Sequence, residues 1–327
     1  TPLVGIITAV WAGSVAAIFG GSHFNVVGPT GALSGLIAAY VAMNGTGGIP
    51  TLTVIVGLMI LAAYLLRLER YLIFIPSSVI NGFTLGVALI IAFGQLNSAL
   101  GLYGLPKHES FFHNVLESLR HLPQASLPTA LVFALSLASL FVLRRFLPKV
   151  PGALLLSPFG IILGYISARG IIPVKVATLG SVFGDVPFHL FQLPHLELSP
   201  TLLVTAAAIA LVAILETMLS AKIADGMTHT KHDERKEMLG LGLANVVVGL
   251  VGGIPATAAL ARTSLNIKTG ASHRTSAALS ALFLALISFF LLPSFRYIPM
   301  AVIASILAYV AVNMVEKEHF MRFYRYQ

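Results

Sequence analysis

About eleven apolar stretches run through the 327 residues, and they limit what this chain can fold into more than any other feature. The stretches contain few Asp, Glu, Lys or Arg residues, and 57% of the chain is hydrophobic against 10% charged. A water-soluble protein of this length needs a more charged surface, whereas a lipid bilayer demands such stretches. The sequence therefore predicts an all-α polytopic membrane protein. The expected segments are 3–19, 31–43, 50–66, 72–95, 127–147, 152–168, 200–223, 236–252, 257–268, 275–292 and 298–315.

The distribution of basic residues fits this interpretation. When the segments are threaded alternately through a bilayer, most of the 20 Lys and Arg residues fall on one side, which marks that side as cytoplasmic. The net charge of +8 thus reflects topology, and we expect the lipid bilayer and no nucleic acid as a partner. The chain has no cysteine, which excludes disulfides and thiolate metal sites. We expect a multi-pass protein of the cell membrane.

Two of the apolar segments are too short to cross a bilayer. The first follows the letters VGPTG and ends near Met43, which gives about 20 Å of helix against a hydrocarbon core of about 30 Å. The second lies within IPATAALARTSLNI. Each comes after a Gly-Gly pair, at 20–21 and 252–253, and a Pro with a Thr close by. Half-helices in matched positions indicate a transporter built from inverted repeats with its ligand site near the membrane midplane. The alternative is that Gly-Gly and Pro only interrupt loops.

The two short helices predict an anion site. A helix N-terminus inside a bilayer leaves unpaired N–H groups and the positive end of a dipole, and an anion satisfies both. For the small residues the alternative role is helix packing, and for Arg262 it is a buried ion pair with Glu216. The candidate substrate-binding residues are Thr30, Gly31, Ala32, Ala259, Leu260, Ala261 and Arg262.

Glu216 is an acidic residue well inside an apolar segment. Placing a charge at the bilayer centre costs at least about 2.5 kcal/mol, so this position calls for a function. We expect Glu216 either to carry a proton or to bind Na⁺ together with Ser220, one helical turn along. The coupling ion is therefore H⁺ or Na⁺, and no cofactor and no resident metal are expected.

Two polar segments are interpreted as structural. The letters THTKHDERKE, residues 228–237, hold several His, Asp and Glu residues. We expect a solvated loop in which Asp233 caps the next helix and Glu234 lies in its first turn, in preference to a metal site. The amphipathic letters FFHNVLESLRHL, residues 111–122, indicate an interfacial helix in preference to a set of ligands.

Four motifs carry a resemblance to a known family: VGPTGALS, ETMLSAKIADGMT, GLAN and GGIPATAALART. With them the chain resembles the sulfate permease (SulP) family of anion transporters over nearly its whole length. The resemblance implies an inverted-repeat transporter fold of seven plus seven spans, a homodimer, and usually a cytoplasmic STAS domain after the last span. The first span, the last two spans and the STAS domain are then expected to lie outside these residues. In the family's bicarbonate transporters Asp and Thr at the positions of Glu216 and Ser220 serve Na⁺, whereas Glu is linked with H⁺ symport.

The resemblance also implies a division of labour along the chain. A core domain is expected in residues 1–66 and 200–293, and a gate domain in residues 67–199 and 294–327. The implied function is secondary active transport of a small anion such as sulfate, bicarbonate or a dicarboxylate, coupled to H⁺ through Glu216 and driven by an elevator-type movement. Two alternatives stay open: an anion channel or anion-dependent motor of the same family, and a nucleobase permease of the same fold. An enzyme is not expected, because the sequence lacks H-E-x-x-H and G-x-G-D motifs.

Overall fold

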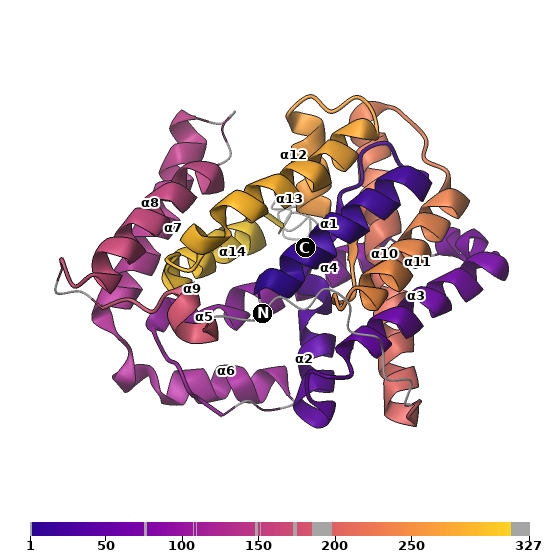
Figure 1. Cartoon of the computed structure of the whole chain (residues 1–327). Helices are drawn as coiled ribbons and strands as arrows, with labels where there is room; N and C mark the ends of the chain where they lie inside the picture. Colours follow the sequence, from indigo (N-terminus) through magenta and orange to yellow (C-terminus); the bar gives the residue numbers. More distant parts are fainter. Residues whose placement is uncertain are drawn as a thin grey trace, which may run out of the picture. The chain divides into compact units, whose positions relative to one another are not determined.

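The computed structural model describes residues 2–74, 77–106, 108, 110–147, 150, 152–172, 175–184 and 198–314 (Figure 1). These residues are mostly helical, with one ribbon of two short strands. Three described helices are long and apolar enough to cross a membrane, and shorter apolar helices accompany them. The three are α7 (Leu127–Phe146), α10 (Pro200–Thr228) and α13 (Thr275–Phe295). The all-helical membrane fold expected from the sequence is therefore present.

The chain divides into two compact units, and each unit takes two separate parts of the sequence. The first unit comprises residues 1–76 and 186–292, and the second comprises residues 77–185 and 293–327. The names core and gate describe how two domains move during transport, and packing alone does not test movement. The division into core and gate domains therefore stays a prediction.

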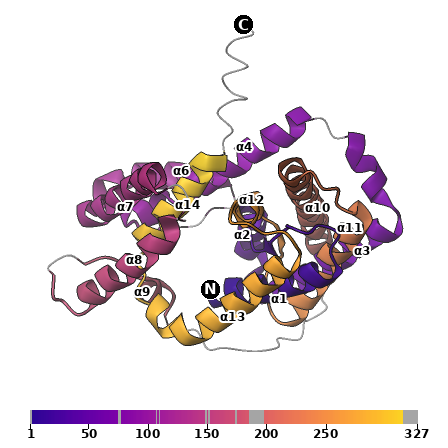
Figure 2. The same ribbon diagram turned by 90° about the horizontal axis from the view of Figure 1, so that it is seen from above.

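The first unit is built around four helices that pack together. Helix α11 (Glu234–Leu250) lies against α3 (Ile49–Leu65) and against α1 (Pro2–Phe19), and α10 also contacts α3 (Figures 1 and 2). Small side chains let these backbones approach closely, which is how helices associate where lipid removes the hydrophobic driving force. The buried cluster at their contact includes Ala12, Leu52, Ile60, Ile209, Met238, Leu241 and Val248.

Two short helices and the strands that precede them complete the first unit. Strand β1 (Val27–Gly28) leads into η1 (Gly31–Leu33) and α2 (Ser34–Asn44), and β2 (Thr257–Ala258) leads into α12 (Leu260–Lys268). The 3-10 helix η2 (Leu68–Phe74) follows α3. The segment of η1 with α2 and the helix α12 are the two half-helices expected from the sequence.

The start of the second short segment depends on a glycine. Helix α11 ends at Leu250, and Gly252 then adopts a φ of 79°, a left-handed conformation that glycine reaches without strain. The N–H of Gly253 donates to the carbonyl of Val248 at 2.8 Å, which closes the helix end. The chain is thereby turned back into the interior toward β2.

The second unit is arranged around α14 (Met300–Met314), which contacts α4, α5, α7 and α8. An isolated bridge between Thr178 and Pro299 ties the start of α9 to the start of α14. The remaining elements are α4 (Ser77–Gly94), α5 (Leu96–Leu100), α6 (Phe111–Arg120), η3 (Leu122–Gln124), α8 (Gly152–Ala168) and α9 (Leu179–Phe183).

Most expected segments coincide with helices, and three differ. Segment 72–95 is wrong as a single helix: η2 ends at Phe74 and α4 begins at Ser77, and Pro76 between them supplies no N–H and disfavours helix before it. Segment 257–268 opens as strand and becomes helical only at Leu260. Segment 200–223 continues to Thr228, where His229 takes a left-handed φ of 55°. The helix expected at 111–122 is present as α6.

Candidate functional site

The two short helices begin at opposite ends of one antiparallel ribbon. Val27 pairs with Ala258, and Gly28 pairs with Thr257. Because the strands run in opposite directions, α2 and α12 leave the ribbon in opposite directions with their N-termini beside it. The ribbon has irregular backbone on both sides, which a membrane protein tolerates only where protein or a water-filled cavity surrounds it. Two helix N-termini from distant parts of the sequence are thus placed next to each other.

Neither of these N-termini has a side-chain cap. Thr30 precedes η1 and Ala259 precedes α12, and neither side chain accepts a hydrogen bond from the helix that follows. Helices α3, α5 and α6 also lack a side-chain cap, whereas α7, α10 and α11 are capped by Ser126, Ser199 and Asp233. The first N–H groups of an uncapped helix need another acceptor, and an anion meets both this need and the helix dipole.

Glu216 lies beside the first of these N-termini. Glu216 is only 7% exposed, and its Oε2 accepts a hydrogen bond from the Thr30 hydroxyl at 3.0 Å. The hydroxyl that the sequence suggested as a donor to an anion is therefore directed at this carboxyl group. A ligand at the N-terminus of η1 would lie next to Glu216, so the two are placed to influence each other.

Arg262 binds the ribbon and not Glu216. Its Nη2 donates to the carbonyl oxygen of Pro29 at 2.8 Å. Its Nη1 lies 2.7 Å from the point where a Cβ on Gly28 would stand, so only glycine leaves room for it there. No Arg262 nitrogen lies within 4.0 Å of a Glu216 oxygen in the described part of the chain, but the two charges are close enough to attract each other, so the buried pair considered as an alternative is present as an electrostatic interaction without a direct contact. The guanidinium keeps further N–H donors beyond the one used on Pro29.

The other expected substrate-binding residues differ in exposure. Gly31, Ala259 and Leu260 are half-buried and Ala261 is exposed, so a ligand can approach these positions. Ala32 is buried and does not offer an open surface.

Ser220, expected to share a cation with Glu216, is engaged elsewhere. Its hydroxyl oxygen lies 2.9 Å from Asn25 Oδ1 and 2.9 Å from Thr263 Oγ1, and the residue is 1% exposed. The structure thus places Ser220 in a buried hydrogen-bond network that includes α12.

The prediction for segment 228–237 is correct for Asp233 and Glu234 and wrong for His232 and Glu237, which are not solvated. Asp233 caps α11 by accepting from the N–H of Lys236, and this hydrogen bond lowers the pKa of the Asp233 carboxyl; Glu234 lies in the first turn, as expected. Glu237 is not solvated: it is 3% exposed and accepts hydrogen bonds from the N–H groups of Gly21 and Ser22. His232 is also withdrawn from solvent and contacts Asp225.

A helical pattern in the sequence marks Glu237 as buried. Positions 237, 241, 245 and 248 lie three or four residues apart and share one face of α11. Leu241, Asn245 and Val248 on this face are buried, so a carboxylate one turn before Leu241 points the same way. The many charged residues of segment 228–237 suggested that all of it is solvated, but the exposed charged residues of α11 lie on its other faces.

Several buried polar residues hold the ribbon in place. The Asn245 side chain donates to the carbonyl of Ala256 at 3.0 Å and accepts from its N–H at 2.8 Å. The Thr217 and Thr257 hydroxyls are 2.8 Å apart, and Thr217 also accepts from the N–H of Ala258. Buried polar groups satisfied in this way fix one arrangement of the backbone.

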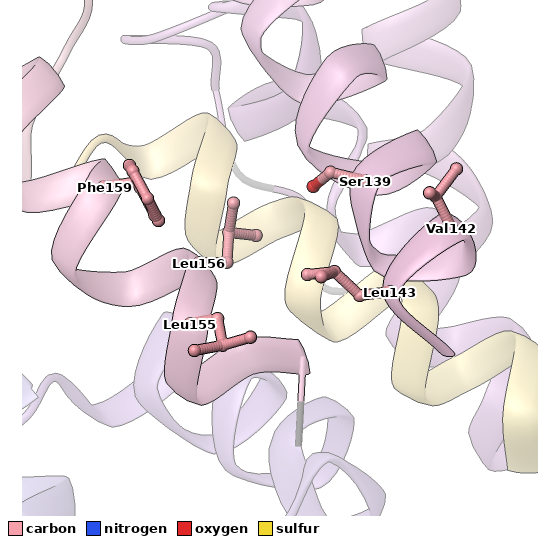
Figure 3. A pocket seen from close by; sticks show the side chains of 6 residues that line it. All are labelled: Ser139, Val142, Leu143, Leu155, Leu156 and Phe159. Carbon is pink, nitrogen blue, oxygen red and sulfur yellow. The ribbon is translucent and has the colours of Figure 1, made fainter. Parts of the chain in front are cut away.

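A pocket in the second unit has a different character. It is about 360 Å³ and lies between α7 and α8 (Figure 3). Its lining is Ser139, Val142, Leu143, Leu155, Leu156 and Phe159. These side chains offer one hydroxyl and no charge, so they do not suit an anion, and the ribbon remains the candidate site.

Comparisons with known proteins agree with the motifs. The family model described as "Sulfate permease family" matches residues 1–327. The putative sulfate transporter YvdB of Bacillus subtilis (strain 168) is 37% identical over 321 residues, which cover 97% of this chain and 60% of that protein. The bicarbonate transporter BicA of Synechocystis sp. is 28% identical over 324 residues, 95% of this chain and 56% of that protein. The chain thus spans 60% or less of the length of these relatives.

A solved structure shows the same architecture. The transmembrane domain of a cyanobacterium bicarbonate transporter BicA aligns with a TM-score of 0.83 and 26% sequence identity, over 96% of this chain and 82% of that one. Together with the apolar helices, this establishes a multi-pass membrane protein whose relatives are transporters and not enzymes. With the family model matching from its first residue to its last, the chain belongs to the sulfate permease family.

Proposed function

We propose that this chain is the membrane part of a secondary active transporter for small inorganic or carboxylate anions. The observation that carries the proposal is the ribbon, which sets two uncapped helix N-termini side by side. Arg262, in the first turn of the second helix, adds a cation where a helix N-terminus is otherwise unfavourable for one, and a bound anion removes that conflict. The relatives named for sulfate and bicarbonate transport fit a ligand of this charge.

The substrate class follows from the kind of donors at the site. Backbone N–H groups and helix dipoles recognise charge and size, so sulfate, bicarbonate and dicarboxylates are the substrates to compare. A nucleobase permease is disfavoured, because the first turn of α12 carries Arg262 and no carboxylate.

We further propose that the coupling ion is H⁺, carried by Glu216, and that no cofactor takes part. The Ser220 hydroxyl, which was expected to bind Na⁺ together with Glu216, lies instead in contact with Asn25 and Thr263, while Glu216 accepts from Thr30. Glu216 can bind a proton without breaking any of these hydrogen bonds. In the same proposal the protein is a homodimer of the cell membrane and works by an elevator-type movement of the unit that contains the ribbon.

The experiment is anion binding and uptake with purified protein in proteoliposomes. Sulfate, bicarbonate, a dicarboxylate, nitrate and chloride are compared as competitors for one labelled anion. Arg262→Gln should weaken binding about tenfold or more, since charge-assisted hydrogen bonds contribute about 1.5–3 kcal/mol. Lys268→Gln is the matched control, because Lys268 is an exposed cation at the other end of α12.

Two results would count against the proposal. Equal binding by wild type and Arg262→Gln would remove Arg262 from the site. Anion-dependent charge movement without net uptake would instead favour the channel or motor alternative.

A further inference from the structure

A buried carboxylate outside the ribbon is connected to both short helices. Glu237 Oε2 accepts from the N–H groups of Gly21 and Ser22 at 2.8 and 2.7 Å, and its Oε1 accepts from the side-chain amide of Asn25. This carboxylate comes from the first turn of α11, whereas its partners lie in the segment between α1 and β1. It is a buried anionic side chain that the proposed transport step does not use.

The hydrogen bonds continue from Asn25 into the second short helix. Asn25 Oδ1 lies 2.9 Å from the Ser220 hydroxyl of α10, and Ser220 lies 2.9 Å from the Thr263 hydroxyl of α12. Thr263 in turn accepts from the N–H of Val26 at 3.2 Å, just before β1. A closed chain of buried groups thus joins α11, the approach to β1, α10 and α12.

We propose that Glu237 is a positioning residue: through Asn25, Ser220 and Thr263 it fixes the two short helices relative to α10. Every member of this chain is buried, so each group depends on its neighbour for a partner. Thr263 follows Arg262 directly and lies within a helical turn of the N-terminus of α12. A shift at Glu237 therefore reaches the candidate anion site without any contact between Glu237 and the ligand.

Glu237→Gln tests this with a minimal change of shape. The amide oxygen of Gln can still accept from the N–H groups of Gly21 and Ser22, but its NH₂ then faces the NH₂ of Asn25. Turning the Asn25 amide does not solve the conflict, because its oxygen would then face the carbonyl oxygen of Thr217, to which Asn25 Nδ2 now donates at 3.2 Å. Glu237→Gln therefore breaks the chain of hydrogen bonds between Glu237 and Asn25.

The first measurement is a distance between the short helices. The 327 residues contain no cysteine, so Ala38→Cys on α2 and Leu265→Cys on α12 give two defined spin-label positions, both exposed. Pulsed electron paramagnetic resonance of the spin-labelled protein should show a broadened or shifted distribution of the distance between the two labels in Glu237→Gln. Glu234→Gln, which removes an exposed carboxylate from the same helical turn, should match wild type.

The second measurement is anion transport, and this arm alone depends on the proposed function. Glu237→Gln should raise the KM for the anion about tenfold or more with a smaller change in kcat, because displacements near 1 Å at a site cost up to about a hundredfold. Thr263→Val, an isosteric change at the other end of the chain, should give the same distance change and the same rise in KM.

The outcomes separate the two ideas. If the distance distribution stays as in wild type while only the melting temperature falls, Glu237 has a merely structural role and the proposal is wrong. If the distances change in both variants but no anion is ever transported, the positioning role stands and the proposed function fails.

Discussion

At the residue scale, Arg262 is held by the backbone of the opposite strand segment. One of its guanidinium nitrogens donates to Pro29, and the other occupies space that a side chain at position 28 would need. The carbonyl of Pro29 is free to accept this bond because a helix has not yet begun there. Gly28 therefore acts on the site through the position of Arg262.

Gly28→Ala should displace the Arg262 guanidinium and lower anion affinity about tenfold, as for loss of a charge-assisted hydrogen bond. Stability should fall less than affinity, because the nearest atom to the new methyl group is the end of a long side chain, whereas Ala9 Cα at 3.3 Å is a tight backbone contact that must shift by a few tenths of an ångström. Affinity and melting temperature are measured on the same samples. Gly35→Ala is the control, since no atom lies within 4 Å of its added Cβ. A large loss of stability in Gly28→Ala would show that the glycine serves packing.

At the element scale, the start of α11 combines a cap with a buried anchor. Asp233 accepts from the N–H of Lys236, and the N–H of Asp233 donates to the carbonyl of Gly21 at 3.2 Å. Glu237, one turn along, binds the N–H groups of the same segment. The N-terminus of α11 is thereby attached to the end of α1, and the approach to β1 is fixed by the same contacts.

Asp233→Ala should lower the melting temperature at neutral pH, since a lost N-cap costs about 1 kcal/mol. The hydrogen bond from Lys236 lowers the pKa of Asp233, so its stabilisation is present above the unfolded value of about 3.9 and disappears as the pH falls through the lower folded value. The difference between wild type and Asp233→Ala should therefore shrink only in strong acid. Asp233→Asn, which retains an acceptor but does not titrate, is the control. A difference that vanishes already near pH 6 would contradict this assignment.

The elements show how far the sequence reaches. Gly-Gly, Pro and the length of the apolar stretches predict the two short helices, because these are local signals. The pairing of Val27 with Ala258 was not predicted, since strands of two residues carry no periodicity and their register depends on residues more than 200 positions apart. Glu237 was missed because its burial depends on the face of α11 and not on its charged neighbours. The roles of Arg262 and Glu216 at an anion site stay predictions.

At the scale of the whole molecule, Glu216 and both short helices belong to one unit. Residues 1–76 and 186–292 form that unit, so the ribbon, Arg262 and Glu216 share one packed body. In the proposed cycle this body moves with the anion and the proton together. Coupling requires that each ligand alters the affinity for the other, and we propose that the contact is the Thr30 hydroxyl, which donates to Glu216 at the N-terminus of η1.

Glu216→Gln should separate anion movement from the proton gradient. Gln keeps an oxygen that accepts from Thr30, so the first short helix retains its neighbour, but it cannot take up or release a proton. In proteoliposomes without Na⁺, a pH step should drive anion uptake by wild type and fail to drive it in Glu216→Gln, while exchange of labelled for unlabelled anion continues.

A control variant and two contrary results test whether the transported proton is carried by Glu216. Glu234→Gln removes an exposed carboxylate of the same chain and should leave the proton-driven uptake as in wild type. Uptake that ignores the pH step in wild type and appears only when Na⁺ is added would transfer the coupling to Na⁺. Ser220 would then have to leave Asn25 and Thr263 to reach the cation, and Ser220→Ala would abolish the Na⁺ dependence. Uptake that follows the pH step equally in wild type and Glu216→Gln would place the transported proton on a group other than Glu216.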